Sequence, residues 1–209
     1  ARGSVARWSA AGKLLAESLV TSTGGVYLLD VTHTGSGQVI AGGEHRVNTV
    51  AFERLLVGLS GDGKKVLWKT QPDVPDVSYV ASLVGEENGA LLAGNILVNG
   101  LATVFVQRVN DKGASVWQRL VGFRDEFATA ADVAVNEGIA MAPRTLVKLP
   151  DGGLALAAQV KVGDFWVAGL AKLDPWGEGS CLEAGKCVSE TPKSCDDGNP
   201  CTIDWCHPN

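Results

Sequence analysis

A pattern that recurs about every fifty residues constrains this chain more than any other feature of its 209 residues. An apolar segment, a turn with Asp or Gly, and a second apolar segment ending in Trp form Val57–Trp68 and again Val106–Trp117. Val5–Leu15 has the same order without the final Trp, and Leu170–Gly177 matches its first half. The turn glycines are Gly12, Gly63, Gly113 and Gly177. Self-similarity of this kind predicts repeated units that bury their apolar faces against one another.

A second pattern lies between these copies. A Gly turn leads into a strand of small apolar residues at Gly37–Gly43, Gly89–Gly94 and Gly152–Ala158. Another apolar segment precedes each one, at Val26–Thr32, Tyr79–Gly85 and Thr145–Leu149. We therefore expect each unit to be a four-stranded antiparallel meander, and four short strands per unit at this period are typical of β-propeller blades.

The predicted fold class is all-β, with propeller-type blades over residues 1–177 and a small disulfide-rich tail over 178–209. The chain holds about three blades and a leading half, in units at 1–20, 21–71, 72–122 and 123–177. Closed propellers have about four to eight blades. We expect further sequence of a longer chain to complete the ring, the alternatives being a second copy or an open stack.

The last unit is longer than the others, and we assign its excess to an insertion over 123–143. Five apolar residues there have the spacing of an amphipathic helical turn ended by Gly138 or Pro143: Phe127, Ala130, Ala131, Ala134 and Val135. An insertion on one face of a propeller is either a binding feature or a spacer.

Aromatic residues give two further predictions. Trp68 and Trp117 hold equivalent positions in the repeat, so we expect both to be structural residues wedged between adjacent sheets. Phe165 and Trp166 are neighbours on one predicted strand, where adjacent side chains face opposite ways. One of these two is therefore predicted to be exposed, as a contact for carbohydrate or a protein partner.

The cysteines mark the boundary of the tail. None occurs before residue 181, and the five disulfide candidates are Cys181, Cys187, Cys195, Cys201 and Cys206. Residues 175–209 carry two basic and six acidic groups. Such short segments are usually held by disulfides formed in an oxidising compartment, which predicts an extracellular or cell-surface location. The spacings lack the C-x2-C pair of most structural zinc sites, and an odd count leaves one cysteine without a partner in this sequence.

The stretch Cys195–Cys206 reads CDDGNPCTIDWC and resembles the CDDGNPCTxDxC cysteine-rich repeats of large secreted or surface proteins of myxobacteria and related predatory bacteria. That family's repeat continues to another Gly-Cys, so the resemblance implies a repeat cut short and a longer chain. The Gly-turn and Gly-x-x-x-Trp marks of residues 1–177 are similar to secreted bacterial propeller-like repeats of the delta-60 or SBBP type. This second resemblance implies a secreted bacterial propeller.

An oxygen-rich cluster in the tail is a candidate calcium site, formed by Asp196, Asp197, Asn199 and Asp204. Gly198 directly follows Asp197 and no Glu closes the loop, so the EF-hand pattern is not met. Solvated turn residues between disulfides are the alternative interpretation. We expect no cofactor, with calcium as the one alternative.

Residues for catalysis are sparse. His33 and His45 lie near Asp30 and Glu44, where a metal site can be drawn, but histidines at strand ends more often face solvent. The acidic residues of predicted loops have no spacing that sets two carboxylates for a glycosidase: Asp73, Asp76, Glu86, Glu87, Asp125 and Glu126. No nucleophile elbow, HExxH helix or phosphate-binding loop occurs. We therefore predict that the protein is not an enzyme.

The charge and hydropathy patterns narrow the partners. A net charge of -5 without a long Lys/Arg block argues against nucleic acid, and no run approaches the ~18 apolar residues of a membrane span. The expected function is a non-catalytic extracellular or cell-surface scaffold that binds protein or carbohydrate. The alternatives are a self-assembling surface fibre subunit, which binds other copies of itself, and a fragment of a secreted propeller enzyme of hydrolase or quinoprotein type.

Overall fold

The computed structural model describes residues 2–22, 24–46, 52–70, 78–98, 101–121, 141–162, 165–177 and 181–182. Every regular element within these ranges is a strand, so the predicted all-β class is confirmed. The strands are β1 (Arg2–Trp8), β2 (Leu14–Thr21), β3 (Gly25–His33), β4 (Val39–Arg46), β5 (Phe52–Leu59), β6 (Val66–Thr70), β7 (Ser78–Glu86), β8 (Gly89–Val98), β9 (Leu101–Asn110), β10 (Ser115–Val121), β11 (Met141–Lys148), β12 (Leu154–Val162), β13 (Phe165–Leu173) and β14 (Cys181–Leu182).

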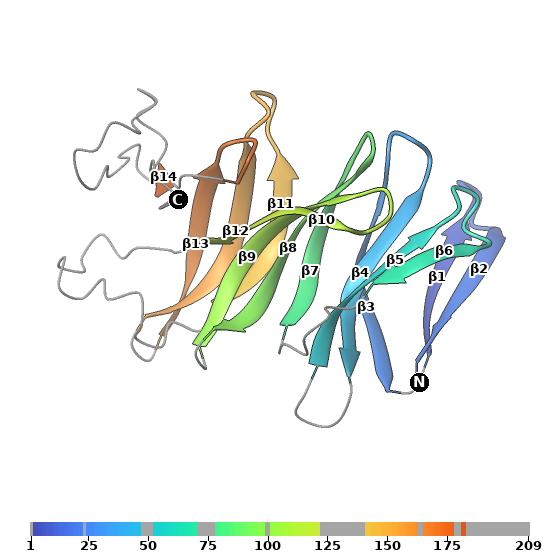
Figure 1. Cartoon of the computed structure of the whole chain (residues 1–209), viewed down its shortest axis with the longest axis horizontal. Coiled ribbons are helices and arrows are strands. Elements are labelled where there is room, and N and C mark those ends of the chain that lie inside the picture. The colour runs from blue at the N-terminus through green and yellow to red at the C-terminus, as the bar shows by residue number, and fades with distance from the viewer. Residues whose placement is uncertain are drawn as a thin grey trace.

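These strands form four antiparallel sheets in chain order. The first sheet is the pair β1–β2, the second is β3 to β6, the third is β7 to β10 and the fourth is β11 to β14. Each strand pairs with the next along the chain, so every sheet is a simple meander. The sheets stand side by side along the long axis of the molecule, from the first sheet at one end to the fourth at the other (Figure 1).

Burial on both faces explains the small-residue strands. In β4, the six residues from Ile40 to His45 are all buried. Sheets on either side cover such a strand, so its sequence is nearly continuously apolar instead of alternating. The small residues Gly42 and Gly43 let the neighbouring backbone and side chains approach closely: a Cβ on Gly42 would lie 2.8 Å from Cγ1 of Val80 in the next sheet.

Among the described residues, the hydrophobic core consists of three layers, one between each pair of successive sheets. The layer between the first and second sheets includes Val20, Val26 and Leu55. The layer between the second and third sheets includes Ile40, Val80 and Phe105. The layer between the third and fourth sheets holds Leu91, Val106, Leu146 and Leu156, among others. Removal of this apolar surface from water is what stabilises the stack.

The first strand of each four-stranded sheet carries a bulge at the same place. Opposite the second strand, the register shifts between Leu28 and Asp30 in β3, between Val80 and Ser82 in β7, and between Pro143 and Thr145 in β11. The extra residues are Leu29, Ala81 and Arg144. An unpaired residue of this kind bends the strand and disrupts its ladder locally.

The predicted insertion over 123–143 is too long at its C-terminal end. Met141, Ala142 and Pro143 already belong to β11, and Pro143 continues a strand there instead of ending a helix. The reason is that β11 lies at the edge of its sheet beside the bulge, where a residue without an N–H is tolerated. Residues 123–140 lie outside the described ranges. Within those ranges the chain forms no helix with the length and apolar character that a membrane crossing demands.

Candidate interaction surfaces

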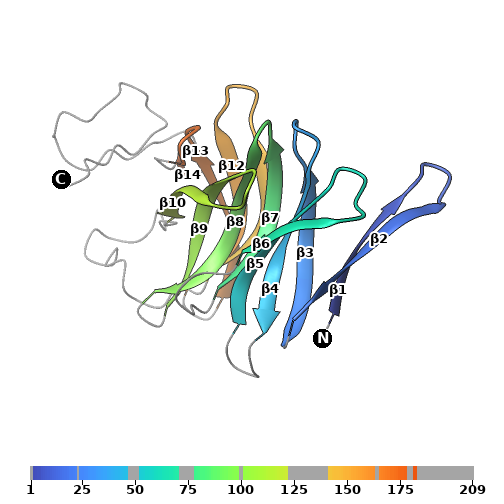
Figure 2. The ribbon, with the colours of Figure 1, turned by 45° about the vertical axis from the view of Figure 1, so that its right-hand side comes forward.

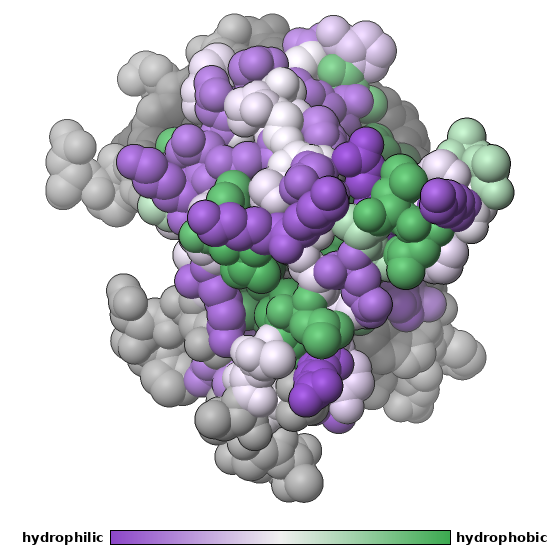
Figure 3. Space-filling model, turned by 90° about the vertical axis from the view of Figure 1, so that its right-hand side faces the viewer, coloured by the Kyte–Doolittle hydropathy of each residue, from purple (hydrophilic) through white to green (hydrophobic). Residues whose placement is uncertain are grey.

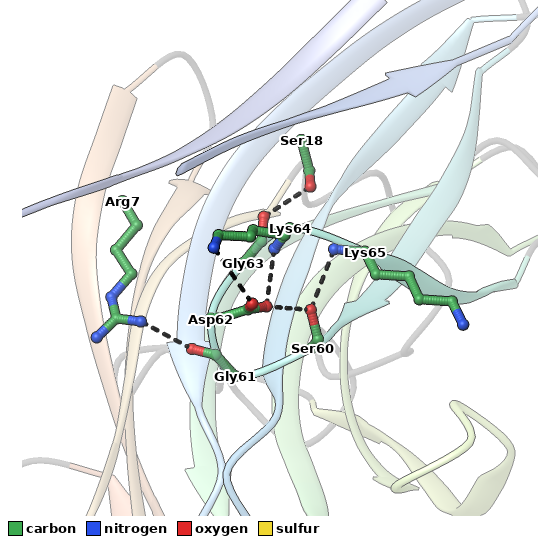
Figure 4. Close-up of polar contacts among 8 residues, drawn as sticks. All are labelled: Arg7, Ser18, Ser60, Gly61, Asp62, Gly63, Lys64 and Lys65. Atoms are coloured by element: carbon green, nitrogen blue, oxygen red, sulfur yellow. Dashed lines mark hydrogen bonds and ion pairs between the residues drawn. The ribbon is translucent and has the colours of Figure 1, made fainter. Parts of the chain in front are cut away.

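The turns between third and fourth strands are built alike. In the turn after β5, the N–H of Gly63 donates to the carbonyl of Ser60 at 2.7 Å. The Ser60 hydroxyl donates to the Asp62 carboxylate at 2.6 Å, and that carboxylate accepts the Lys64 N–H at 3.1 Å (Figure 4). These two hydrogen bonds, that of Ser60 foremost, lower the pKa of Asp62 below its ordinary value. The ionised Asp62 carboxylate therefore stabilises the turn by accepting hydrogen bonds from Ser60 and Lys64.

The same main-chain bond recurs in the other turns of this kind. The N–H of Gly12 donates to Ser9, that of Gly113 to Asn110 and that of Gly177 to Asp174, at 2.9–3.1 Å. All four glycines have φ between 72° and 77°, a left-handed conformation that favours Gly: Gly12, Gly63, Gly113 and Gly177. The four turns between third and fourth strands therefore share one main-chain hydrogen bond and one left-handed glycine.

The turns with Gly63, Gly113 and Gly177 also contact the preceding sheet. The Ser18 hydroxyl of β2 donates to the carbonyl of Gly63 at 2.6 Å, and Arg7 of β1 reaches the carbonyl of Gly61 (Figure 4). The turn with Gly113, in the third sheet, contacts Trp68 of the second sheet, and the turn with Gly177, in the fourth sheet, contacts Trp117 of the third. A Cβ on Gly113 would lie 2.5 Å from the Trp68 ring, and one on Gly177 would lie 2.8 Å from the Trp117 ring. The turns therefore dock the sheets onto one another.

The structure places Trp68 on β6 and Trp117 on β10, both half-buried and packed against the core layer that faces the following sheet. Their indole groups differ in polar contacts. Nε1 of Trp68 donates to Oε1 of Gln38 at 3.4 Å. Nε1 of Trp117 is buried and has no hydrogen-bond partner among the described residues. The register puts Gly89 where the second sheet has Gln38, which accounts for the missing acceptor.

A small hollow opens on the turn edge between the third and fourth sheets, with a volume of about 190 Å³. Its lining residues are Glu86, Leu91, Arg108, Lys148, Gly152, Pro175 and Trp176. Glu86 has a largely buried carboxylate, which pairs with Nε of Arg108 at 2.6 Å and with Nζ of Lys148 at 3.1 Å. Two cations around one carboxylate leave the hollow with an excess of hydrogen-bond donors.

Trp176 stands at the rim of this hollow with 61% of its surface exposed. The turn fixes its main chain, because its N–H donates to the carboxylate of Asp174 at 2.8 Å. Sequence analysis missed Trp176 as a site residue. The sequence does hold a signal for its exposure, because Trp176 lies in a predicted turn, where an aromatic side chain has no strand neighbours to pack on.

The histidines near Asp30 and Glu44 do not form a metal site. His33 pairs with Val39 and His45 pairs with Val26, so the two lie at opposite ends of the β3–β4 pair. His45 is buried, with its Nε2 2.6 Å from the Ser22 hydroxyl and its Nδ1 3.7 Å from Glu53. Glu44 instead pairs with Arg46, whose pKa this contact raises. In the part of the chain that the structure describes, no three His, Cys, Asp or Glu residues group as metal ligands.

The remaining predicted site residues are mostly outside the described part. Phe165 and Trp166 begin β13 and pair with Val162 and Lys161, but their side chains are not among those described. Cys181 lies in β14 opposite Lys172. The other four cysteines and the candidate calcium ligands Asp196, Asp197, Asn199 and Asp204 fall beyond residue 182. Their disulfide and calcium assignments stay predictions.

A comparison with protein-family models finds no match for this chain, and a comparison with curated proteins finds none either.

Proposed function

We propose that this protein is a non-catalytic extracellular scaffold whose sheets are propeller-type blades and which binds carbohydrate in the hollow beside Trp176. One observation carries this proposal: an indole exposed over 61% of its surface stands next to a carboxylate, a guanidinium and an ammonium group. An exposed indole supplies a flat apolar face for a sugar ring. The charged groups supply the hydrogen bonds that orient its hydroxyls.

The size of the hollow limits the ligand. Pockets for drug-sized molecules span about 300–1,000 Å³, whereas this one has about 190 Å³. It therefore suits one sugar unit of a longer glycan, with neighbouring units lying across the rim of turns. The cysteine-rich acidic tail supports an extracellular or cell-surface location, where glycans are the abundant partners.

The proposal is tested with two Trp variants of the full chain. Trp8 on β1 is 59% exposed, a fraction similar to the 61% of Trp176. Trp8 is not one of the residues that line the hollow. On an array of bacterial polysaccharides, Trp176→Ala is expected to lose binding that the wild type and Trp8→Ala retain. Equal binding by all three proteins, or no binding by the wild type to any glycan, would contradict the carbohydrate proposal.

A second candidate function, a self-assembling surface subunit, is favoured by the outer face of the fourth sheet. Leu170 of β13 is 44% exposed there, whereas its counterparts by register, Leu56 and Val106, are 4% and 0% exposed beneath a following sheet. Exposed apolar sheet faces recruit partners. Light scattering on a sizing column under non-reducing conditions tests this candidate. A broad high-mass distribution would support a fibre subunit, and a single monomer peak would oppose it.

A further inference from the structure

The exposure of one residue differs sharply between equivalent positions in the three larger sheets. Val31, Leu83 and Leu146 each lie two residues after the bulged residue of a first strand. Leu83 is 7% exposed and Leu146 is 2% exposed, because the preceding sheet covers each of them. Val31 is 52% exposed. The face of β3 that looks toward the first sheet therefore has less cover than the corresponding faces of β7 and β11.

The cause is that the first sheet is a half sheet. The pair β1–β2 has its register shift just after the turn, with Leu15 as the extra residue, as β5–β6 has with Leu67 and β9–β10 has with Val116. β1 and β2 therefore hold the places of third and fourth strands. Between the second and third sheets, β7 packs on the first, second and third strands of its neighbour, namely β3, β4 and β5. β3 packs on β1, which holds a third-strand place. In the described part of the first sheet, the places of a first and a second strand are empty.

The pictures agree with this account. β1 and β2 approach β3 near one end and diverge from it toward their turn (Figure 2). Seen from that end of the stack, apolar groups gather in the middle of the surface, between hydrophilic ones (Figure 3). We define the end groove by residues: its floor is the face of β3 with Leu28 and Val31, and its wall is the edge of β1 opposite β2.

In the other sheets a side-chain acceptor on one first strand binds a main-chain N–H of the next first strand. Among the described residues, β3 receives no such hydrogen bond from a preceding first strand. The Asp30 carboxylate of β3 accepts the N–H of Leu83 at 2.6 Å, and the Ser82 hydroxyl of β7 accepts the N–H of Leu146 at 3.0 Å. In both cases an acceptor after the bulge of one first strand binds the next first strand. The equivalent N–H of Val31 is accepted by its own neighbour, the second oxygen of Asp30, at 2.8 Å. Asp30 thus substitutes for an acceptor that a preceding first strand would supply.

We propose that the end groove binds a two-stranded β-hairpin. The hairpin would have the sequence pattern of the first and second strands of this protein's four-stranded sheets, such as β7 and β8. Its second strand would add to the edge of β1, completing a four-stranded sheet. Its first strand would cover Val31 and place a Ser, Thr or Asp side chain after its bulge beside the Val31 N–H. The inference does not depend on carbohydrate binding at Trp176.

The geometry favours a hairpin over the fourth sheet of a second copy. That sheet has first and second strands, β11 and β12, but β13 already occupies its third place. In the end groove the third place belongs to β1. A whole fourth sheet would therefore collide with β1 unless one of the two strands were displaced, whereas a hairpin fills the two empty places without displacing anything.

The test uses the full chain and a labelled synthetic peptide of residues 78–98, which spans β7 and β8. We expect saturable binding by fluorescence anisotropy, no binding of a peptide of scrambled order, and slower hydrogen exchange over Arg2–Trp8 when the 78–98 peptide is bound. Val31→Lys is expected to weaken binding by at least about tenfold, because a hairpin would bury the ammonium group against an apolar floor. Val116→Lys is the matched control, since Val116 is 58% exposed on β10 at the outer edge of the third sheet.

Three results would overturn the proposal: equal binding of both peptides, equal effects of the two lysine variants, or exchange protection confined to β11–β13. Self-association of the chain that the peptide does not compete with, and that Val31→Lys abolishes, would assign the groove to a second copy instead. If circular dichroism shows that Val31→Lys is unfolded, Val31→Ser takes its place, with Val116→Ser as control. Trp176→Ala should leave peptide binding unchanged, so a failure here is distinguishable from a failure of the carbohydrate proposal.

Discussion

The carboxylate of Asp30 in β3 accepts a hydrogen bond of 2.6 Å from the main-chain N–H of Leu83 in β7. A side chain of one sheet thereby satisfies a backbone group of the next. The bulge in β7 accounts for the need, because its register shift falls between Val80 and Ser82, directly before Leu83. Ser82 does the same for Leu146 one sheet further on. These hydrogen bonds join each first strand to the next one. Because hydrogen bonds are directional, they restrict sliding of one sheet along its neighbour more than apolar packing does.

Asp30→Ala should therefore destabilise the stack. The change leaves the N–H groups of Val31 and Leu83 without their acceptor. Water can replace the carboxylate at the exposed Val31, so the loss comes from the part-buried Leu83 N–H, at about 1–3 kcal/mol for an unsatisfied buried donor. Asp30→Ser keeps one acceptor, as Ser82 does naturally, and should retain part of that stability. Urea denaturation followed by circular dichroism measures the difference. Equal losses in the Ala and Ser variants would show that the hydrogen bond to the neighbouring sheet contributes nothing.

Gly113→Ala should reduce stability more than Gly12→Ala. Both glycines have the left-handed backbone, with φ of 76° and 77°, so an alanine is strained equally at either site, by about 1–2 kcal/mol. A Cβ on Gly113 would also meet the Trp68 ring at 2.5 Å, whereas one on Gly12 has nothing within 4 Å. The excess loss at Gly113, measured by chemical denaturation, reports the docking of the turn on Trp68. Identical losses would mean that this docking is easily relaxed.

The titration of Asp62 provides a pH-dependent test. Its pKa is lowered chiefly by the hydrogen bond from Ser60 and then by that from the Lys64 N–H, so Ser60→Ala should raise the pKa toward the ordinary value. Because the folded pKa lies below the unfolded one, the contribution of Asp62 to stability is present above the unfolded pKa. It is lost as the pH falls through the folded pKa. Carboxyl NMR titration of wild type and Ser60→Ala measures the shift, and an unchanged pKa would contradict the assigned cause.

Trp117→Phe should cost less stability than Trp68→Phe. Each change removes part of a half-buried ring, so the packing losses are similar. Trp68 also gives up the hydrogen bond from its Nε1 to Gln38, whereas the Trp117 Nε1 is buried without a partner among the described residues. Removing an unsatisfied donor is nearly neutral, so the two variants should differ by about 1 kcal/mol. A larger loss for Trp117→Phe would indicate that its N–H has an acceptor after all.

Much of the fold follows from local patterns. The Gly/Asp turns, the Trp-ended strands and the small-residue strands predict an all-β meander, and the structure has that meander. The sequence predicts an insertion over 123–143 that ends at Gly138 or Pro143, and residues 141–143 of it belong to β11. An edge strand next to a bulge accepts Pro, and neither the edge position nor the bulge is visible in a single sequence.

The candidate hollow depends on contacts between distant parts of the chain. The prediction that Phe165 or Trp166 is exposed stays a prediction, because their side chains lie outside the described ones. The hollow instead draws attention to Trp176, which lies in a turn. The hollow joins Glu86 of β7, Arg108 of β9 and Lys148 of β11, which are 22 and 40 residues apart in the chain. Side chains that meet only after two sheets have packed together leave no common motif in the sequence.

The sequence by itself determined the strands and turns, because both depend on interactions within a few residues. Alternation and apolar runs decide where strands lie, and a glycine with a left-handed backbone decides where Gly12, Gly63, Gly113 and Gly177 turn the chain. Only the tertiary structure decided which positions are covered. Val31 and Leu83 occupy the same place in the same local pattern, yet one is exposed and the other buried. Burial depends on the sheet that packs on a residue, and that sheet comes from a distant part of the chain.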